Sequence, residues 1–206
     1  TPEGARASAP KPATEKPEVK PARSGNYYLD DGPASAPPAN LESIPDAIPR
    51  SEPLHRFANN PYSALGQDFI PERTIKPFRQ RGLASWYGRR FHGNKTATGE
   101  IYDMFQLSGA HPTLPLPSYA RITNTQNGRQ IVVRLNDRGP FLRNRVMDLS
   151  YAAALKLGYA EQGVAMIEIE AIVPSEVDRL AADGTPLPVI GPERVLESKT
   201  NQKAFP

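Results

Sequence analysis

Apolar and polar residues alternate in two stretches of the chain, and this pattern predicts β-strands there. Residues 130–135 read Gln-Ile-Val-Val-Arg-Leu, so Ile131, Val133 and Leu135 share one face. A strand with one apolar face turns that face toward a core. The stretch 164–173 predicts a second strand of the same kind. Its apolar positions are Ala165, Ile167, Ile169 and Ala171, which alternate with Glu168 and Glu170.

A hairpin and a further strand are expected before these residues. The dipeptide Asn127-Gly128 lies between the β-rich runs 119–124 and 130–135. Asn-Gly favours a tight hairpin turn because both central residues then need a positive φ. Residues 82–88, which are bounded by glycines, predict another short strand.

One helix is expected between the strands, over residues 151–157. Ser150 can accept hydrogen bonds from the first free N–H groups, and Gly158 suits the left-handed exit. Many short strands with a single helix are typical of a small β-barrel.

Proline is concentrated at the two ends of the chain, which has 206 residues and 23 prolines. Proline mixed with alanine and charge favours extended chain over a packed core. We therefore expect a Pro-rich stalk over 1–58, an extended lead-in that packs on the barrel over 59–77, the barrel over 78–173, and a linker over 174–206. Within the linker, a short helix is expected near 175–182.

Several chemistries are excluded by residues that the chain lacks. It has no cysteine and only 3 histidines, none of them paired at a zinc-ligand spacing, so neither a metal nor a cofactor is expected. Neither a Gly-x-Ser-x-Gly motif nor a phosphate-binding Gly-rich loop occurs. No apolar run is long enough for a membrane span. The net charge of +3 is mild and does not indicate nucleic acid. An arginine-rich barrel segment suits either an anionic carbohydrate or a solubilising surface.

The most specific polar group follows the strand that ends at Leu135. Asn136 and Asp137 come next, followed by Arg138 and a Gly-Pro turn. This order places Asn136 and Asp137 at the rim of the barrel, where side chains can face a groove. An Asx turn in which Asp137 pairs with Arg138 would also explain the residues.

Three other loops carry candidate groups. The loop 96–100 ends in Glu100, and Asp103 follows three residues later. His111 precedes a rigid Pro-rich loop, although a lone histidine is more often a structural hydrogen-bonding residue than a catalyst. Asp148 precedes the helix, where it could instead help to cap it. Carboxyl groups that move protons and flat rings such as Trp86 and Tyr87 are the residues of a carbohydrate site, although Trp86 could also belong to the core.

Taken together and in order, these segments resemble the double-psi β-barrel domain of the rare lipoprotein A family of septal lytic transglycosylases. Asn60-Pro61-Tyr62 resembles the usual lead-in of that family. The matching runs are 82–88, 91–93, 96–100, 110–115, 136–141 and 148–150. The resemblance implies a mainly β protein, a six-stranded double-psi β-barrel with one or two short helices, flanked by long Pro-rich disordered or extended tails.

The resemblance also implies an activity. Members cleave the β-1,4 bond between N-acetylmuramic acid and N-acetylglucosamine in peptidoglycan and leave a 1,6-anhydro end, in cell-wall remodelling and daughter-cell separation. Matched by motif, the expected catalytic residues are Asp137, Glu100 and His111. More distant double-psi barrels, the expansins and family 45 endoglucanases, make Asp148 a second candidate. The residues expected to bind substrate are Trp86, Tyr87, Asp103, Asn136, Arg138 and Asp148.

We expect Asp137 to be the general acid, with a pKa raised by partial burial or by Glu100. A cation beside it would oppose this, so Arg138 is expected to point away from Asp137, toward substrate or another acid. His111 is expected to bind the acetamido group or to stabilise developing charge. Asp137, Glu100 and His111 are therefore expected to line one trench.

Two other readings stay open. A non-catalytic, expansin-like wall-loosening barrel would keep the groove and the rings but not need the carboxylates. A structural septal protein would act through its tails.

By resemblance, the location is the periplasmic face of the outer membrane, reached through a lipidated cysteine that this chain does not contain. The expected partners are peptidoglycan strands and divisome proteins, without nucleic acid. The 33 residues after Val173 are too few for the peptidoglycan-binding module that often ends family members.

Overall fold

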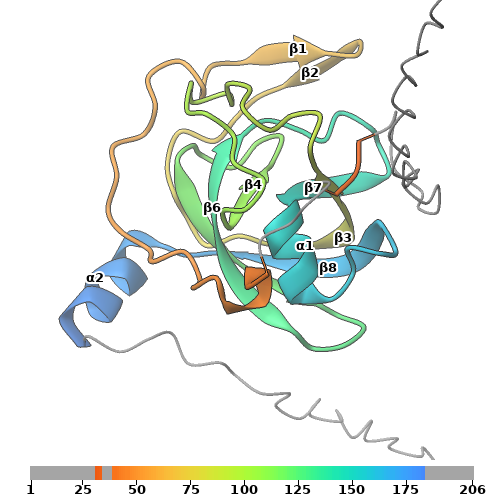
Figure 1. The fold of residues 1–206 in the computed structure, drawn as a ribbon. Coiled ribbons are helices and arrows are strands. Elements are labelled where there is room, and N and C mark those ends of the chain that lie inside the picture. The colour runs from red at the N-terminus through yellow and green to blue at the C-terminus, as the bar shows by residue number, and fades with distance from the viewer. Residues whose placement is uncertain (1–30, 34–38, 184–206) are drawn as a thin grey trace, which may run out of the picture.

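Six strands close into a barrel in the computed structural model, which describes residues 31–33 and 39–183 (Figure 1). The order around the barrel is β3-β7-β4-β6-β5-β8, and the pairs β3/β7 and β4/β6 are parallel. This crossed connectivity is that of a double-psi β-barrel, so the expected fold is confirmed. The strands are β3 (Arg79–Tyr87), β4 (Ser108–Ala110), β5 (Ser118–Asn124), β6 (Gln130–Asp137), β7 (Arg145–Ser150) and β8 (Val164–Ala171).

The alternating strands point their apolar residues into the barrel as predicted. Ile131, Val133 and Leu135 of β6 are buried in the main core. So are the odd-numbered residues 165–171 of β8, while Glu168 forms an ion pair with Arg81 of β3 on the outer face. Binary patterning was therefore enough to orient both strands.

The predicted hairpin is present, but its turn is longer than expected. β5 and β6 pair in antiparallel fashion, and Gly128 has a φ of 72°. Asn127 does not have a positive φ, so the expected two-residue turn is wrong. The side chain of Asn127 instead accepts from Arg129 N and donates to Leu157 O, at 2.9 Å each. These two bonds stabilise a wider loop that rests on the end of α1 (Tyr151–Leu157).

The helix α1 has the predicted start and stop. Ser150 Oγ accepts from Ala153 N at 3.3 Å, and Gly158 has a φ of 76°. Most of its residues are buried, and Leu41 of the short 3-10 helix η2 (Leu41–Ser43) belongs to the same core. The helix is thus enclosed by the barrel on one side and by η2 on the other.

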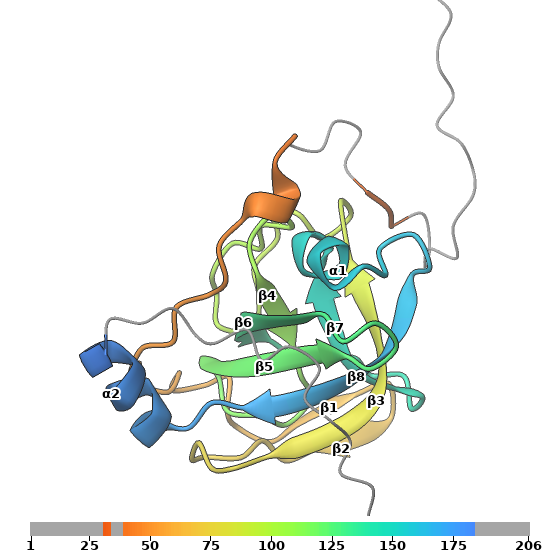
Figure 2. The same cartoon turned by 90° about the horizontal axis from the view of Figure 1, so that it is seen from below.

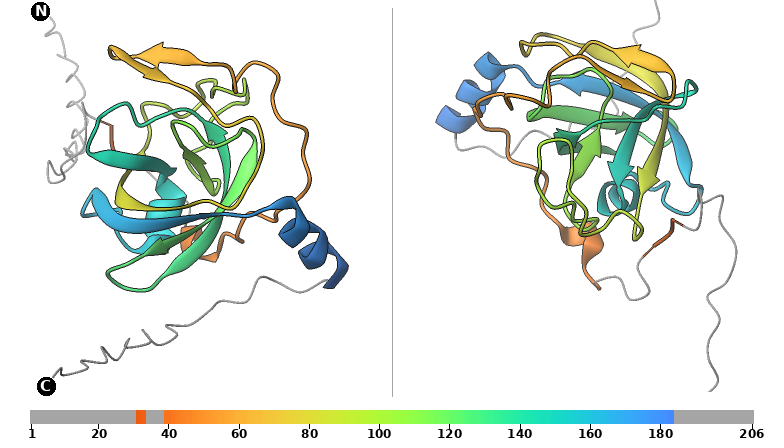
Figure 3. Two further views of the ribbon diagram at one scale, coloured as in Figure 1. Left: turned by 180° about the vertical axis from the view of Figure 1, so that it is seen from behind. Right: turned by 90° about the horizontal axis from the view of Figure 1, so that it is seen from above.

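The described part of the predicted stalk does not stand free of the barrel. From η2 the chain runs along the outside of the barrel to a hairpin at its opposite end (Figures 2 and 3). Ala47 N donates to Val132 O at 3.1 Å, and Asp46 Oδ2 accepts from Val132 N at 2.9 Å. Asp31 likewise accepts from Gly88 N at 2.8 Å. The boundary at residue 58 is therefore wrong for residues 31–33 and 39–58, because side-chain and backbone bonds dock this extended chain. Residues 1–30 and 34–38 lie outside the described residues.

The lead-in over 59–77 packs on the barrel as expected, but it contains a hairpin of β1 (Tyr62–Ala64) and β2 (Gln67–Phe69). The turn residues Leu65 and Gly66 both have positive φ, at 48° and 71°. Tyr62 attaches the hairpin to the barrel by donating its hydroxyl to Pro112 O at 2.8 Å. Phe141 packs against the hairpin rings, 5.8 Å from Phe69.

The C-terminal linker begins with the expected short helix, α2 (Pro174–Asp183). Val177 is buried against Tyr119 and Val132, and Glu176 pairs with Arg121 at 2.9 Å. The rest of the linker, 184–206, lies outside the described residues. No helix within 31–33 and 39–183 has the length and apolar character that crossing a bilayer requires.

Candidate functional site

Asp137 lies at the last position of β6, where the register with β4 shifts. Its Oδ1 accepts two backbone hydrogen bonds, from Ala97 N and from Arg138 N, at 2.8 Å each. Burial raises the pKa of this carboxyl above its ordinary value, against the opposing effect of those two donors. The side chain remains partly exposed. A carboxyl that is held in place and keeps its proton more readily than usual can serve as an acid.

Asp148 shares a row with Asp137 across four neighbouring strands. The row runs Ser85, Asp148, Ala110 and Asp137 through β3, β7, β4 and β6. Two strand spacings separate the aspartates, which corresponds to about 10 Å between their Cα atoms. Ser85 Oγ donates to Asp148 Oδ1 at 2.6 Å, and Arg145 lies 3.3 Å from the same oxygen. Burial raises the pKa of Asp148, and the charge of Asp148 in turn raises that of Asp137.

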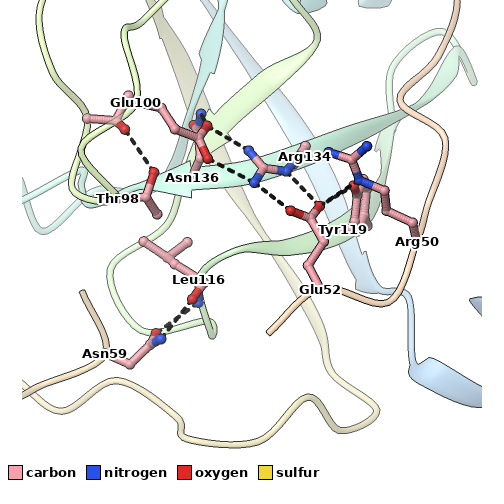
Figure 4. A network of polar contacts seen from close by, with 10 residues as sticks. Arg50, Glu52, Asn59, Thr98, Glu100, Leu116, Tyr119, Arg134 and Asn136 are labelled. Atoms are coloured by element: carbon pink, nitrogen blue, oxygen red, sulfur yellow. Dashed lines mark hydrogen bonds and ion pairs between the residues drawn. The ribbon is translucent and has the colours of Figure 1, made fainter. Parts of the chain in front are cut away.

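Glu100, unlike Asp137, is held in its ionised form by an ion network on the outer face of β6 (Figure 4). Arg134 donates to both of its carboxylate oxygens, at 2.7 and 2.9 Å, and Asn136 Nδ2 donates at 2.9 Å. The adjacent edge of the same guanidinium, Nε and Nη2, binds Glu52 through two bonds of 2.9 Å. These hydrogen bonds lower the pKa of Glu100.

The surroundings of Asp137 and Glu100 thus shift their pKa values in opposite directions. Asp137 is shifted toward the protonated form and Glu100 toward the ionised form. When environments push the pKa values of two acids apart, one acid can donate a proton while the other stays charged. The expectation that Glu100 raises the pKa of Asp137 finds no support, since the raising influences are burial and Asp148.

His111 does not line a trench with these two carboxyls, contrary to expectation. Its side chain is 2% exposed. Nδ1 accepts from Thr113 N and Leu114 N, at 3.1 and 2.9 Å, so the proton is on Nε2, which lies 3.2 Å from Gln80 Oε1. Burial lowers its pKa to about 3, so the ring is neutral and fully hydrogen-bonded. His111 therefore fixes the 111–114 turn, and its backbone N donates to Asp137 O at 3.1 Å.

The state of His111 gives a direct spectroscopic prediction. The ring signals of His111 should not titrate between pH 5 and 8, because a pKa of about 3 keeps the imidazole neutral throughout that range. NMR of uniformly labelled protein measures this, with His111→Gln used to assign the signals. A titration midpoint near the ordinary value of 6.5 would contradict the buried, neutral ring.

Arg138 points its guanidinium away from Asp137 as expected, and toward backbone carbonyls instead of another acid. Its guanidinium donates to Ala58 O, His111 O and Leu114 O, at 2.6 to 3.1 Å. It also donates to Asn59 Oδ1 at 2.9 Å. Arg138 thus joins the lead-in to the loop beside the site and is engaged in structure.

The two aromatic residues expected to stack on sugars are packed within the protein. Tyr87 is 9% exposed, and its ring stacks on Tyr102 at 4.1 Å, so it does not offer a face to a ligand. Its hydroxyl is buried and has no hydrogen-bond partner among the described residues. Burial is the largest influence that raises the pKa of the Tyr87 hydroxyl, and the charges of Asp137 and Asp148 raise it further. Trp86 donates Nε1 to Ala160 O at 3.0 Å and packs against α1.

Asp103 and Asn136, two of the residues expected to bind substrate, both line a groove. This groove has a volume of about 690 Å³, and Glu100 and Arg134 also line it. Asp103 is fixed by Phe105 N, which donates to Oδ1 at 3.0 Å. Asp137 is not among the lining residues, but it is adjacent in sequence to Asn136.

The sequence patterns did not single out Glu52 and Arg134, whose ion pairs lie beside the groove. Strand alternation places Arg134 on the outer face of β6, yet no local pattern indicates that two carboxylates bind it. Glu52 precedes Arg134 by 82 residues and lies in a segment whose composition predicts an unattached stalk. In residues 31–33 and 39–183, no three His, Asp, Glu or Cys side chains are grouped as metal ligands would be.

Comparisons with known proteins place these residues in a family context. A family model described as lytic transglycolase matches residues 79–169. The chain is 48% identical over 162 residues to the endolytic peptidoglycan transglycosylase RlpA of Neisseria meningitidis serogroup A, an alignment that covers 77% of this chain and 68% of that protein. It is 49% identical over 151 residues to RlpA of Pseudomonas aeruginosa strain UCBPP-PA14, covering 73% of this chain and 43% of that protein.

Solved structures that resemble the chain match only part of it. The Streptomyces papain inhibitor is 25% identical with a TM-score of 0.37, and it covers 44% of this chain and 92% of its own. An expansin from Clavibacter michiganensis is 15% identical with a TM-score of 0.36, and it covers 47% of this chain and 52% of its own.

Proposed function

The chain belongs to the RlpA family of endolytic peptidoglycan transglycosylases, and from this premise we propose that Asp137 is the general acid of its reaction. The protein is a peptidoglycan lytic transglycosylase. It cleaves the β-1,4 bond between N-acetylmuramic acid and N-acetylglucosamine and forms 1,6-anhydro-N-acetylmuramic acid ends.

In the proposed reaction Asp137 acts twice. Its proton passes to the glycosidic oxygen as the bond from that oxygen to C1 of the muramic acid breaks. The resulting carboxylate then takes the proton of the C6 hydroxyl, whose oxygen forms the new bond to C1. The proton balance closes on one residue and no water is consumed, so a second carboxyl acting as base or nucleophile is not needed, unlike in hydrolysis.

The observation that carries this proposal is the way in which Asp137 is held. Oδ1 is occupied by two backbone donors, Ala97 N and Arg138 N. Among the described residues nothing donates to Oδ2, so the proton can reside there. Burial raises the pKa, which favours the protonated form that the first step requires.

Glu100 has a supporting part in the proposal. Its lowered pKa keeps it ionised, and Arg134 and Asn136 fix its orientation. A fixed carboxylate can accept hydrogen bonds from sugar hydroxyl and N–H groups and so orient the strand. Asp148 is assigned an electrostatic part, since its negative charge disfavours ionisation of Asp137.

The part of Asp148 can be tested through the pH profile. If Asp137 must be protonated, the rate falls as the pH rises through its pKa. Asp148→Asn removes a charge that raises this pKa, so the alkaline limb should move to lower pH. Initial rates on glycan strands between pH 3 and 8 measure the shift, with Asp178→Asn on the exposed face of α2 as the control. An unmoved limb would contradict the electrostatic role, and complete loss of turnover would assign the chemistry to Asp148 itself.

Product analysis tests the reaction as a whole. Purified protein is incubated with peptide-free glycan strands, and the released fragments are analysed by mass spectrometry. Transglycosylation yields ends lighter by one water than hydrolysis does. An expansin-like barrel would bind strands without releasing either product.

The substrate also bears on the location of the protein. Peptidoglycan lies outside the cytoplasmic membrane, and relatives named for acting on it are consistent with an extracytoplasmic enzyme. We further propose a lipid anchor at the outer membrane and contacts with divisome proteins. The Pro-rich composition of residues 1–30 suits a tether to such an anchor.

A further inference from the structure

We propose that residues 44–50, which precede the barrel, form one wall of the glycan-binding cleft. The groove between this wall and the barrel would bind N-acetylated sugars next to the bond that is cleaved. The inference rests on the proposed function, because it assigns the groove to the same strand. The volume of about 690 Å³ lies within the range of roughly 300–1,000 Å³ that is usual for ligand sites.

The groove has two sides that come from distant parts of the chain. Residues 44–48 and Arg50 line one side. The other side consists of residues from the loop 100–108 together with Tyr119, Arg134 and Asn136. A barrel without its N-terminal segment would present only the second side, which is a surface and not a groove.

The wall is firmly attached. Lys156 at the end of α1 donates to Ile44 O at 2.7 Å and forms an ion pair with Asp46 at 2.8 Å. Ala47 and Asp46 both bond the backbone of Val132, at 3.1 and 2.9 Å. A wall that is already fixed costs a ligand little ordering entropy on binding.

The wall is also linked directly to a site residue. Two residues beyond Arg50, Glu52 binds the guanidinium of Arg134, which binds Glu100 (Figure 4). The Arg134 hydrogen bonds are the largest influence lowering the pKa of Glu52, to about 2. Both carboxylates are therefore ionised at neutral pH, and Arg134 holds the wall and Glu100 in one arrangement.

The groove comes within one residue of the proposed acid along β6, although Asp137 itself does not line it. Asn136 lines it and is followed directly by Asp137. The loop 96–100 also connects the groove to the acid. Ala97 N donates to Asp137 at one end of this loop, and Glu100 lines the groove at the other. Asn136 Oδ1 is a buried acceptor without a donor among the described residues. A sugar N–H or hydroxyl could supply that donor after a small movement of the side chain.

The lining offers partners to N-acetylated sugars. Glu100 and Asp103 can accept hydrogen bonds from hydroxyl and acetamido N–H groups, and Arg50 adds a positive charge on the wall. Beside them, Ile48 and Ile101 are 82% and 61% exposed and can contact the apolar faces of sugar rings. Alternating polar and apolar contacts are what a chain of N-acetylated pyranoses requires.

Single cysteine substitutions can test the wall, because the sequence contains no cysteine. Ile48→Cys is introduced into the full chain carrying Asp137→Asn, which keeps the glycan intact. Alkylation of the introduced thiol is timed with and without a peptide-free tetrasaccharide of alternating N-acetylglucosamine and N-acetylmuramic acid. We expect saturating glycan to slow the alkylation of the Ile48→Cys variant several-fold, because the bound strand covers the thiol.

Leu65→Cys is the matched control, since Leu65 is 72% exposed at the tip of the β1–β2 hairpin and does not line the groove. Its alkylation rate should not change. Equal protection of both variants, protection at the hairpin alone, or no protection would overturn the proposal. The wild-type chain could release anhydro products while the thiol of the Ile48→Cys variant stays unprotected. That result would leave the proposed function intact and contradict only the role of residues 44–50 in binding.

Discussion

Asp137→Asn is expected to lower the rate of anhydro-sugar formation by a factor of about 10²–10⁴, the usual loss when a general acid is removed. The amide cannot protonate the leaving oxygen or take the proton of the C6 hydroxyl. Mass spectrometry of glycan digests measures the effect. Asp68→Asn, on the exposed β2 strand, is the matched control and should leave the rate unchanged. Undiminished turnover by Asp137→Asn would move the acid role to Asp148 or Glu100.

The same variant should fold at least as well as the wild type. Asn Oδ1 can accept the bonds from Ala97 N and Arg138 N that Asp137 accepts now. The folded-state pKa of Asp137 is raised above the ordinary 3.8, so ionising it costs the native state stability as the pH rises through that raised value. Asp137→Asn removes this cost. Its melting temperature should therefore equal or exceed that of the wild type at pH 7, with the advantage disappearing below pH 3.8.

The parts of the fold that the sequence predicted are those with local causes. Alternation oriented β6 and β8, and Ser150 and Gly158 marked the two ends of α1, because each signal acts within a few residues. The hairpin was located by Gly128, yet its turn was misjudged. Contacts from Asn127 to the end of α1 decided its length, and these join residues 30 apart.

The site was predictable only in part, for the same reason. Motifs singled out Asp137 and Glu100, and the loop that carries Glu100 does lie beside Asp137 at the end of β6. The buried ring of His111 is paired with Gln80, 31 residues away, which no spacing rule connects to it. Composition indicated that residues 39–58 are extended, but not that Glu52 would bind Arg134 across 82 residues.

Arg138→Lys tests whether this residue contacts substrate or supports structure. The guanidinium donates to the carbonyls of Ala58, His111 and Leu114 and to Asn59, and an ammonium cannot reach all of them. Buried acceptors left without donors cost about 1–3 kcal/mol each where they find no water. We expect a loss of about 2–4 kcal/mol in the free energy of unfolding, measured by urea denaturation. The KM for glycan strands should stay near that of the wild type.

Arg143→Lys is the matched control, because Arg143 is exposed in the loop that follows Arg138. It should change neither stability nor KM. The two readouts separate the roles of Arg138, since a ligand contact affects KM at constant stability, whereas a structural clamp affects stability first. A raised KM with unchanged urea unfolding would return Arg138 to the binding surface. A structural clamp should lower stability and leave KM unchanged, because its four acceptors belong to residues 58–59 and to the loop beside Asp137.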